Sequence, residues 1–287
     1  MSVSTCNQHP SYRLEAAGPS CRVVRIAGLR IDALSEAECI RRIMDDLRVG
    51  RGGWVITPNL DHLRRVCRDS RLRRIYEEAS IIVADGMPLI WASRLQGTPL
   101  PQRVAGSTLI WTLSEAAAAN GRSVYLLGGA AGAADRAAAV LRSRYPDLRI
   151  AGTSCPEMGF EKDPTQMAGL IERLRSADAD IVYVALGSPK QEWLIHRVRH
   201  CLPHAWWLGV GISFSFVAGQ VARAPLWMQR MGLEWLHRLS QEPRRLMRRY
   251  LVDGLPFAAW LLTHAILSRR AARASRVGTA PGGVLIE

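Results

Sequence analysis

Asp85 is the residue of this chain whose position most clearly suggests acid–base chemistry. It follows the apolar run 81–84 and precedes Gly86 and Pro88. If that run is a strand, Asp85 lies at its carboxyl end, where open α/β sheets place their ligand sites. A carboxylate held there by a rigid turn could accept the proton of an attacking hydroxyl group. On these residues alone a second interpretation has equal weight, in which Asp85 only caps the helix that follows Pro88.

Thr57 and Asn59 follow another apolar run and offer a hydroxyl and an amide that could hydrogen-bond a sugar or a base. Asn59 would serve equally well as the N-cap of a helix. Gly128 and Gly129 end a third run and lead into an alanine-rich segment, so a diphosphate could approach the N-terminus of a helix there. The full dinucleotide-binding pattern of glycines is absent, and tight packing of a helix on a strand explains these two glycines as well.

Three adjacent side chains and two loop arginines could bring charge to the same edge of a sheet. Lys190, Gln191 and Glu192 follow a glycine-rich turn and would lie on the first turn of a helix. Arg103 and Arg223, each in a loop, could neutralise a phosphate. An isolated surface arginine is usually only solvated, so these two gain meaning only if the fold brings them together.

The sequence indicates neither a metal site nor a cofactor. Asp178 and Asp180 form an Asp-x-Asp pattern that can hold a divalent ion, but the pair comes at the start of its expected strand, opposite to the expected site. His196 and His200 lie four apart on one expected helix without an evident third ligand. The six cysteines contain no Cys-x-x-Cys pair, which argues against both a zinc site and a disulfide framework.

The elements that must position these residues alternate regularly between strands and helices. We expect strands at 22–32, 53–58, 80–84, 123–127, 148–153, 180–186 and 205–210. We expect helices at 35–48, where Ser35 and Glu38 form a capping box, and at 60–78, 107–119, 131–145, 165–176 and 190–201, with a short one after Pro88. The expected fold is therefore α/β and Rossmann-like, with right-handed βαβ units, a mainly parallel sheet and helices on both faces.

The two ends of the chain differ from this alternating region. Residues 1–20 are polar and aperiodic, and we expect them to be disordered. We expect residues 21–224 to form the α/β domain that carries the site, and residues 225–287 to form a basic helical appendage with a flexible end. The net charge is +13, and the segment 230–276 alone holds ten arginines against three acidic residues. More than half of the excess positive charge therefore lies in this segment of the appendage.

The apolar stretch 250–267 suggests contact with a membrane surface. It contains Asp253 and Pro256, so we do not expect an uninterrupted helix that spans a bilayer. An apolar face with Trp260, bracketed by arginines, suits a helix in the headgroup region of an anionic membrane. The alternative is a helix packed on the body of the protein, with solvated arginines. Residues 1–20 hold no apolar run of signal-peptide length, which predicts a cytoplasmic location.

Eight short motifs stand along the chain in a fixed order. They are Thr57-Pro58-Asn59, Asp85-Gly86, Arg103-Val104, Leu127-Gly128-Gly129, the run 187–192, Gly209-Val210-Gly211, Arg223-Ala224-Pro225 and the run 232–249. In this order they resemble the motifs of the WecG/TagA/CpsF glycosyltransferases, over about residues 24–252. Such a series is far more specific than any one of its members.

The resemblance implies an inverting glycosyltransferase, without a required metal or cofactor, that moves a hexose from a UDP-sugar to a sugar carried on polyprenyl diphosphate. By this resemblance Asp85 is the catalytic base, and Thr57, Asn59, Arg103 and Gln191 line or contact the substrate pocket. The appendage would approach the anionic inner membrane from its cytoplasmic face. Its arginines nearest to the lipid diphosphate would be Arg238, Arg245 and Arg249.

Two departures from the usual motifs bear on the identity of the sugar. Ser215 follows Phe214, and Ser107 follows Gly106, at points where many members of the family have an aspartate. The pattern favours the exopolysaccharide branch of the family, typified by the xanthan-type β-1,4-glucosyltransferases, with UDP-glucose as the donor. The alternative is transfer of N-acetylmannosamine, or of its uronic acid, to N-acetylglucosaminyl-diphospho-polyprenol.

A function of a different class would be a non-catalytic module that binds nucleic acid through its +13 charge. Carboxylates at strand ends would repel phosphates, and the basic excess clusters beside an apolar segment with tryptophans, so the sequence argues against it. We therefore expect a UDP-sugar, a lipid-linked acceptor and a membrane surface as partners, and no nucleic acid. An oligomer is compatible with the sequence.

Overall fold

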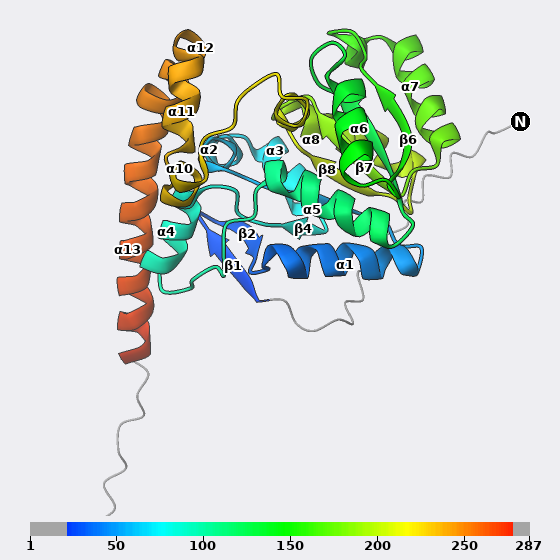
Figure 1. The fold of residues 1–287 in the computed structure, drawn as a ribbon. Coiled ribbons are helices and arrows are strands. Elements are labelled where there is room, and N and C mark those ends of the chain that lie inside the picture. The colour runs from blue at the N-terminus through cyan, green and yellow to red at the C-terminus, as the bar shows by residue number, and fades with distance from the viewer. Residues whose placement is uncertain (1–21, 278–287) are drawn as a thin grey trace, which may run out of the picture.

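In the computed structural model, which describes residues 22–277, a six-stranded parallel sheet lies between two layers of helices (Figure 1). The strand order is β4-β3-β8-β7-β5-β6, so the expected α/β fold with a mainly parallel sheet is confirmed. Residues 1–20, which we expect to be disordered, lie outside the described residues, as do the last ten. The strands of this sheet are β3 (Gly53–Ile56), β4 (Ile81–Ile82), β5 (Ser123–Gly128), β6 (Arg149–Ser154), β7 (Ile181–Ala185) and β8 (Trp206–Gly209).

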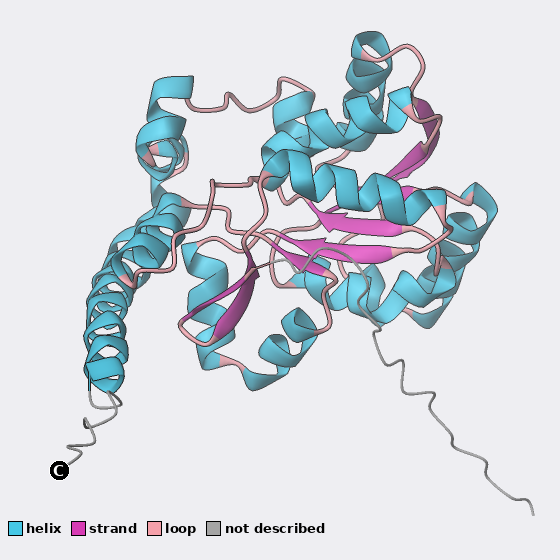
Figure 2. Cartoon of the chain, turned by 90° about the horizontal axis from the view of Figure 1, so that it is seen from below, coloured by secondary structure: helices cyan, strands magenta, loops and turns pink. Residues whose placement is uncertain are grey.

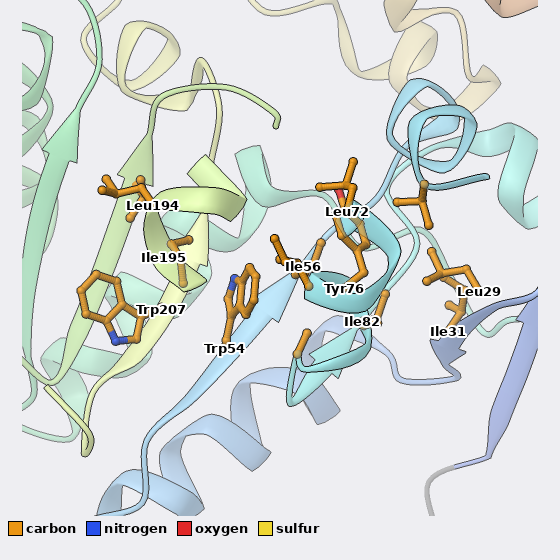
Figure 3. Packing of buried hydrophobic residues seen from close by; sticks show 14 of the residues in the cluster. Leu29, Ile31, Trp54, Ile56, Leu72, Tyr76, Ile82, Leu194, Ile195 and Trp207 are labelled. Atoms are coloured by element: carbon orange, nitrogen blue, oxygen red, sulfur yellow. The ribbon is translucent and has the colours of Figure 1, made fainter. Parts of the chain in front are cut away.

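Two separate hydrophobic clusters cover the two faces of the sheet, because side chains alternate along each strand. Val55 of β3 points to the face covered by α1 (Glu36–Arg48), α5 (Gly106–Ala119) and α6 (Ala133–Arg144). Trp54 and Ile56 point to the other face, where they meet Tyr76 and Ile195 (Figure 3). The helices on that second face are α2 (Leu60–Arg68), α3 (Ser70–Glu77), α4 (Met87–Leu95), α7 (Pro164–Ala177) and α8 (Lys190–Val198).

The expected single strand at 22–32 is wrong, because the chain reverses in its middle. β1 (Val23–Ile26) and β2 (Leu29–Asp32) form an antiparallel hairpin outside the main sheet. Ala27 and Gly28, with φ of 48° and 80°, make the two-residue turn that links them. Turns of this kind require positive φ at both central positions, and an alanine there gives little warning in the sequence.

The hairpin supports the strand that leads to Asp85. β4 is an edge strand, and its Ile82 N–H donates to the Asp32 carboxylate over 2.8 Å. Asp32 is buried and also lies 3.5 Å from the Arg30 guanidinium. The Asp32 carboxylate at the end of β2 therefore accepts a hydrogen bond at the open edge of β4, where a neighbouring strand would otherwise supply the acceptor.

We expect Asp32→Ala to lower the free energy of unfolding by about 1–3 kcal/mol, because it leaves a buried backbone N–H without an acceptor. Urea denaturation at constant pH measures this loss. Asp32→Asn retains an acceptor oxygen and should cost clearly less. Equal losses in the two variants would show that the hydrogen bond to Ile82 is not what matters.

The expected helix at 60–78 is two helices, α2 and α3, separated at Asp69. This residue has extended backbone angles, and its carboxylate accepts hydrogen bonds from the N–H groups of Arg71 and Leu72. An aspartate that caps the following helix competes with continuation of the preceding one. The capping box of Ser35 and Glu38 at the start of α1 is confirmed.

The appendage, residues 225–277 here, consists of α10 (Leu226–Met231), α11 (Glu234–Gln241), α12 (Pro243–Met247), a π-helical turn (Arg248–Gly254) and α13 (Leu255–Val277). Its last helix runs along α4 at the edge of the body (Figures 1 and 2). Leu261 and Ala265 are buried there in the second-face cluster. The appendage is therefore packed on the body through α13, while much of its apolar surface stays exposed.

The expected interruption of the helical stretch 250–267 is wrong. The Leu255 N–H donates to the carbonyl of Tyr250, five residues earlier, so the widened turn accommodates Pro256 without ending the helix. By length and composition alone, the segment Arg248–Ala271 could cross a membrane, a test that core helices of soluble proteins also pass.

Candidate functional site

A cavity of about 1410 Å³ opens where the carboxyl ends of the parallel strands meet. Its lining comes from the segments that follow β3, β4, β5, β7 and β8, from the loop 156–161 and from the appendage. Open parallel sheets place ligand sites at this edge because every strand ends there. The structure thus gathers at one cavity the strand ends that the sequence singles out.

Asp85 lies in this cavity on a rigid backbone. Its N–H donates to the Pro58 carbonyl over 2.9 Å, and the Ala84 carbonyl accepts from the Val104 N–H over 2.9 Å. Burial raises the pKa of the Asp85 carboxyl to about 6, with Glu234 adding to the rise and nearby arginines opposing it. The N-cap of α4 is Gly86, and Asp85 forms no side-chain hydrogen bond or ion pair with any described residue. The cap interpretation of Asp85 is therefore wrong.

Thr57 and Asn59 both line the cavity, and Asn59 also caps a helix. Its Oδ1 accepts from the N–H groups of Asp61 and His62 at the start of α2, as the alternative interpretation expects. His62 lines the cavity too, although no motif in the sequence singles it out. Burial first, and then the Arg249 charge, lower its pKa to about 4, so the imidazole is neutral near pH 7. The only hint of His62 in the sequence is its position three residues after Asn59, the N-cap of α2.

The two glycines after β5 have different roles. Gly129 lines the cavity, and a Cβ on it would lie 3.1 Å from the Phe214 ring. Gly128 is not part of the lining, and a Cβ there would come within 2.8 Å of Leu186 and 3.0 Å of the Ala185 carbonyl. The packing interpretation thus fits both glycines, and Gly129 in addition lines the cavity just before α6.

The three adjacent side chains of α8 also separate. Gln191 lines the cavity, where its Oε1 accepts from the Gly211 N–H and its Nε2 donates to the Glu192 carboxylate, each over 3.1 Å. Glu192 is buried beneath the lining, and burial raises its pKa. Lys190 also lines the cavity, where it is largely exposed and lies 3.5 Å from Glu161. Glu192 therefore supports Gln191 and does not itself line the cavity as the sequence led us to expect.

The appendage brings charged side chains of both signs to the site. Glu234 and Arg238 of α11 line the cavity, together with Arg249. Arg103 and Arg223 lie behind this wall, and both approach the Glu234 carboxylate, at 3.1 and 3.8 Å. The structure therefore unites the loop arginines expected at the site, and it adds Glu234, which the sequence analysis did not single out. The side chain of Arg245, also expected here, lies outside the described residues.

A second carboxylate missed from the sequence, Asp61, anchors the appendage from the body side. It is buried and forms ion pairs with Arg249 at 2.9 Å, Arg65 at 2.9 Å and Arg64 at 3.1 Å. Arg64 in turn pairs with Asp253 of the appendage at 3.1 Å. Arginines surround Asp61, and their charges outweigh its burial and lower its pKa.

Among residues 22–277, no group of three or more His, Cys, Asp and Glu side chains is arranged to hold a metal ion. Asp180 has a structural role instead, because it accepts hydrogen bonds from the backbone and hydroxyl of Ser123 and from Arg122. It precedes β7, at the end of the sheet away from the cavity.

The cavity combines a partly buried carboxylate, whose pKa is raised to about 6, with cationic side chains on one wall. Such a carboxylate can take a proton from a hydroxyl group, and the arginines can stabilise an anionic phosphate. Gly129 and the polar side chains of Thr57, Asn59 and Gln191 complete a site for a polar, negatively charged ligand.

Comparisons with known proteins agree with this chemistry. The family model described as "Glycosyl transferase WecG/TagA/CpsF family" matches residues 24–271. A protein of Bacillus subtilis is 34% identical over 197 residues, which cover 69% of this chain and 75% of the relative. A protein of Bacillus spizizenii is 32% identical over 198 residues, with the same two coverages. Both are named N-acetylglucosaminyldiphosphoundecaprenol N-acetyl-beta-D-mannosaminyltransferase.

Proposed function

Since the chain belongs to the WecG/TagA/CpsF family of glycosyltransferases, we propose that it transfers N-acetylmannosamine from UDP to N-acetylglucosamine carried on polyprenyl diphosphate. Both relatives are named for this sugar and this type of acceptor, so the comparisons favour the alternative over the UDP-glucose expectation. They lend no support to an exopolysaccharide role. Membership of an enzyme family also sets aside the nucleic-acid-binding module.

The observation that carries the mechanism is the unpaired carboxylate of Asp85 in the cavity. This carboxylate, with a pKa of about 6, is deprotonated at neutral pH and still basic enough to accept a proton. We infer that it removes the proton of the acceptor hydroxyl as that oxygen attacks the anomeric carbon of the donor. The bond to the UDP oxygen breaks in the same displacement, and a single displacement inverts the configuration at that carbon.

The leaving diphosphate of UDP and the lipid diphosphate both require positive charge. In this proposal Arg238 and Arg249 meet phosphate directly, because both line the cavity. Arg103 and Arg223 support them from behind, and the peptide groups around Gly129 can approach a phosphate closely. Preorganised cations of this kind stabilise the negative charge that develops on a leaving group.

A transfer assay with a panel of donors tests the proposed function. The purified protein is mixed with a synthetic N-acetylglucosaminyl-diphospho-lipid and with UDP-N-acetylmannosamine, its uronic acid or UDP-glucose, each with and without a chelator. We expect transfer from UDP-N-acetylmannosamine that survives the chelator. Transfer from UDP-glucose alone would overturn the choice of sugar, and loss of activity with the chelator would overturn the expected metal independence.

The exposed apolar residues of the appendage support a peripheral position on a membrane surface, and we propose that this surface is the cytoplasmic face. Trp260, Leu255 and Leu267 of α13 are 46%, 50% and 55% exposed, and arginines flank the helix on both sides. Such a surface can enter the headgroup region of an anionic leaflet. The lipid-linked acceptor would then reach the cavity without leaving the bilayer.

We expect the double substitution Trp260→Glu and Leu267→Glu to lower binding to anionic vesicles by roughly tenfold or more, since two large apolar side chains leave the interface. Sedimentation with phosphatidylglycerol-containing vesicles measures this change. Val140→Glu is the matched control, because Val140 is exposed on α6 in the body and should not affect binding. Equal binding by all three proteins would contradict a role for α13 at the membrane.

A further inference from the structure

Glu234, at the start of α11, is a carboxylate inside the site to which the proposed mechanism gives no role. We propose that Glu234 is a positioning residue of the catalytic centre, which holds the Arg103 guanidinium and so keeps it from closing onto Asp85. This inference rests on the proposed function, because it concerns the base of that reaction. Its basis is the arrangement of three charged side chains from three separate parts of the chain.

Arg103 depends on Glu234 more than the neighbouring arginine does. The Arg103 Nη1 lies 3.1 Å from the Glu234 Oε2, and no other described side chain bonds to this guanidinium. Arg223 also approaches Glu234, at 3.8 Å, but its guanidinium donates as well to the Thr108 hydroxyl and the Ser107 carbonyl, at 3.1 and 3.4 Å. Removal of the Glu234 charge would therefore free Arg103 while Arg223 stays in place.

Without the Glu234 charge, the Arg103 guanidinium would move toward the Asp85 carboxylate. After burial, the charge of Arg103 has the largest effect on the pKa of Asp85, yet no described cation is close enough to form an ion pair with this carboxylate. The other charges acting on Asp85 are Glu234, which raises its pKa, and Arg223 and Arg238, which lower it. A full ion pair with a guanidinium lowers a carboxyl pKa by about 1–3 units, and a less basic carboxylate accepts a proton less readily.

Glu234 belongs to the appendage, whereas Asp85 and Arg103 belong to the body. Side-chain exposures of 17% for Arg103 and 19% for Glu234 show that their ion pair is partly shielded from water, so it is stronger than a surface pair. Once α11 has docked, Arg103 has a partner other than the base. The appendage therefore contributes a negative charge to catalysis as well as its arginines.

The test is the pH dependence of transfer by Glu234→Gln, a variant that keeps the size of the side chain and one acceptor oxygen but loses the charge. We expect the acid limb of kcat/KM to move to lower pH by roughly half a unit to one unit, because Asp85 loses a negative neighbour and gains Arg103. The plateau value should fall by up to about tenfold as the base weakens. Glu234→Asp restores the charge and should return the limb toward that of the parent.

Asp253→Asn is the matched control. It neutralises another appendage carboxylate that pairs with the body, at 3.1 Å from Arg64, and Asp253 is not among the charges that shift the pKa of Asp85. Its acid limb should match that of the parent. An unmoved limb in Glu234→Gln, with only a uniform loss of rate, would overturn the proposal and leave Glu234 as a docking residue. Carbon-13 NMR titration of the Asp85 carboxyl measures the same shift without turnover, so a protein that fails to transfer sugar would contradict the proposed function alone.

Discussion

Asp85→Asn is expected to lower kcat for sugar transfer by roughly one hundred to ten thousand fold, the range that a positioned general base contributes. Asparagine fills the same space but cannot accept the hydroxyl proton. The donor still binds through groups that the substitution leaves unchanged, so KM for the UDP-sugar should vary little. Steady-state transfer kinetics give both values. A variant with the activity of the parent would refute the assignment of Asp85 as the base.

Loss of activity in this variant should not come from unfolding. The carboxyl pKa rises from 3.8 to about 6 on folding, so the folded protein binds more protons than the unfolded chain between these values. Stability due to this group therefore falls as the pH rises through that window. Asparagine carries no such penalty, so Asp85→Asn should have a higher Tm than the parent at about pH 8, and the difference should vanish below about pH 4. Melting curves at the two pH values check this.

The sequence predicts best those parts of the site that depend on the sheet alone. Asp85, Thr57 and Gln191 each follow an apolar run, and the carboxyl ends of parallel strands must meet at one edge. Their common cavity follows from the alternation of strands and helices, before any contact is known. The same reasoning could not separate Gly129, which lines the cavity, from Gly128, which packs behind it, because both fit the same turn.

The contribution of the appendage could not be predicted in this way. The ion pairs of Glu234 with Arg103 and of Asp61 with Arg249 join residues 131 and 188 positions apart, so they form only when the appendage docks on the body. No local spacing encodes such ion pairs. The continuous helix through Pro256 was missed for a different reason, because the π-helical turn that absorbs the proline depends on the backbone and has no clear sequence pattern.

Of the two appendage arginines that line the cavity, Arg238 and Arg249, Arg238 is the one without a carboxylate partner among the described residues. Arg103 pairs with Glu234, and Arg249 pairs with Asp61. The Arg238 guanidinium instead lies 6.0 Å from the Phe216 ring and lines the cavity. Its charge is thus more available to a phosphate than that of Arg249, because binding does not require an existing ion pair to break.

We therefore expect Arg238→Gln to lower kcat/KM by roughly one hundred to one thousand fold, the loss that follows removal of one preorganised group facing a developing negative charge. Arg244→Gln is the control, because Arg244 is exposed on α12 and its loss changes the net charge equally.

The pH profile separates this effect from a general loss of structure. Arg238 lowers the pKa of Asp85, so its removal should move the acid limb to higher pH, opposite to the shift expected for Glu234→Gln. Opposite shifts in the two variants require both charges of α11 to act on the same base. If Arg238→Gln kept the rate and the limb of the parent, phosphate binding would have to rest on Arg249, and the free charge of Arg238 would have no part in the reaction.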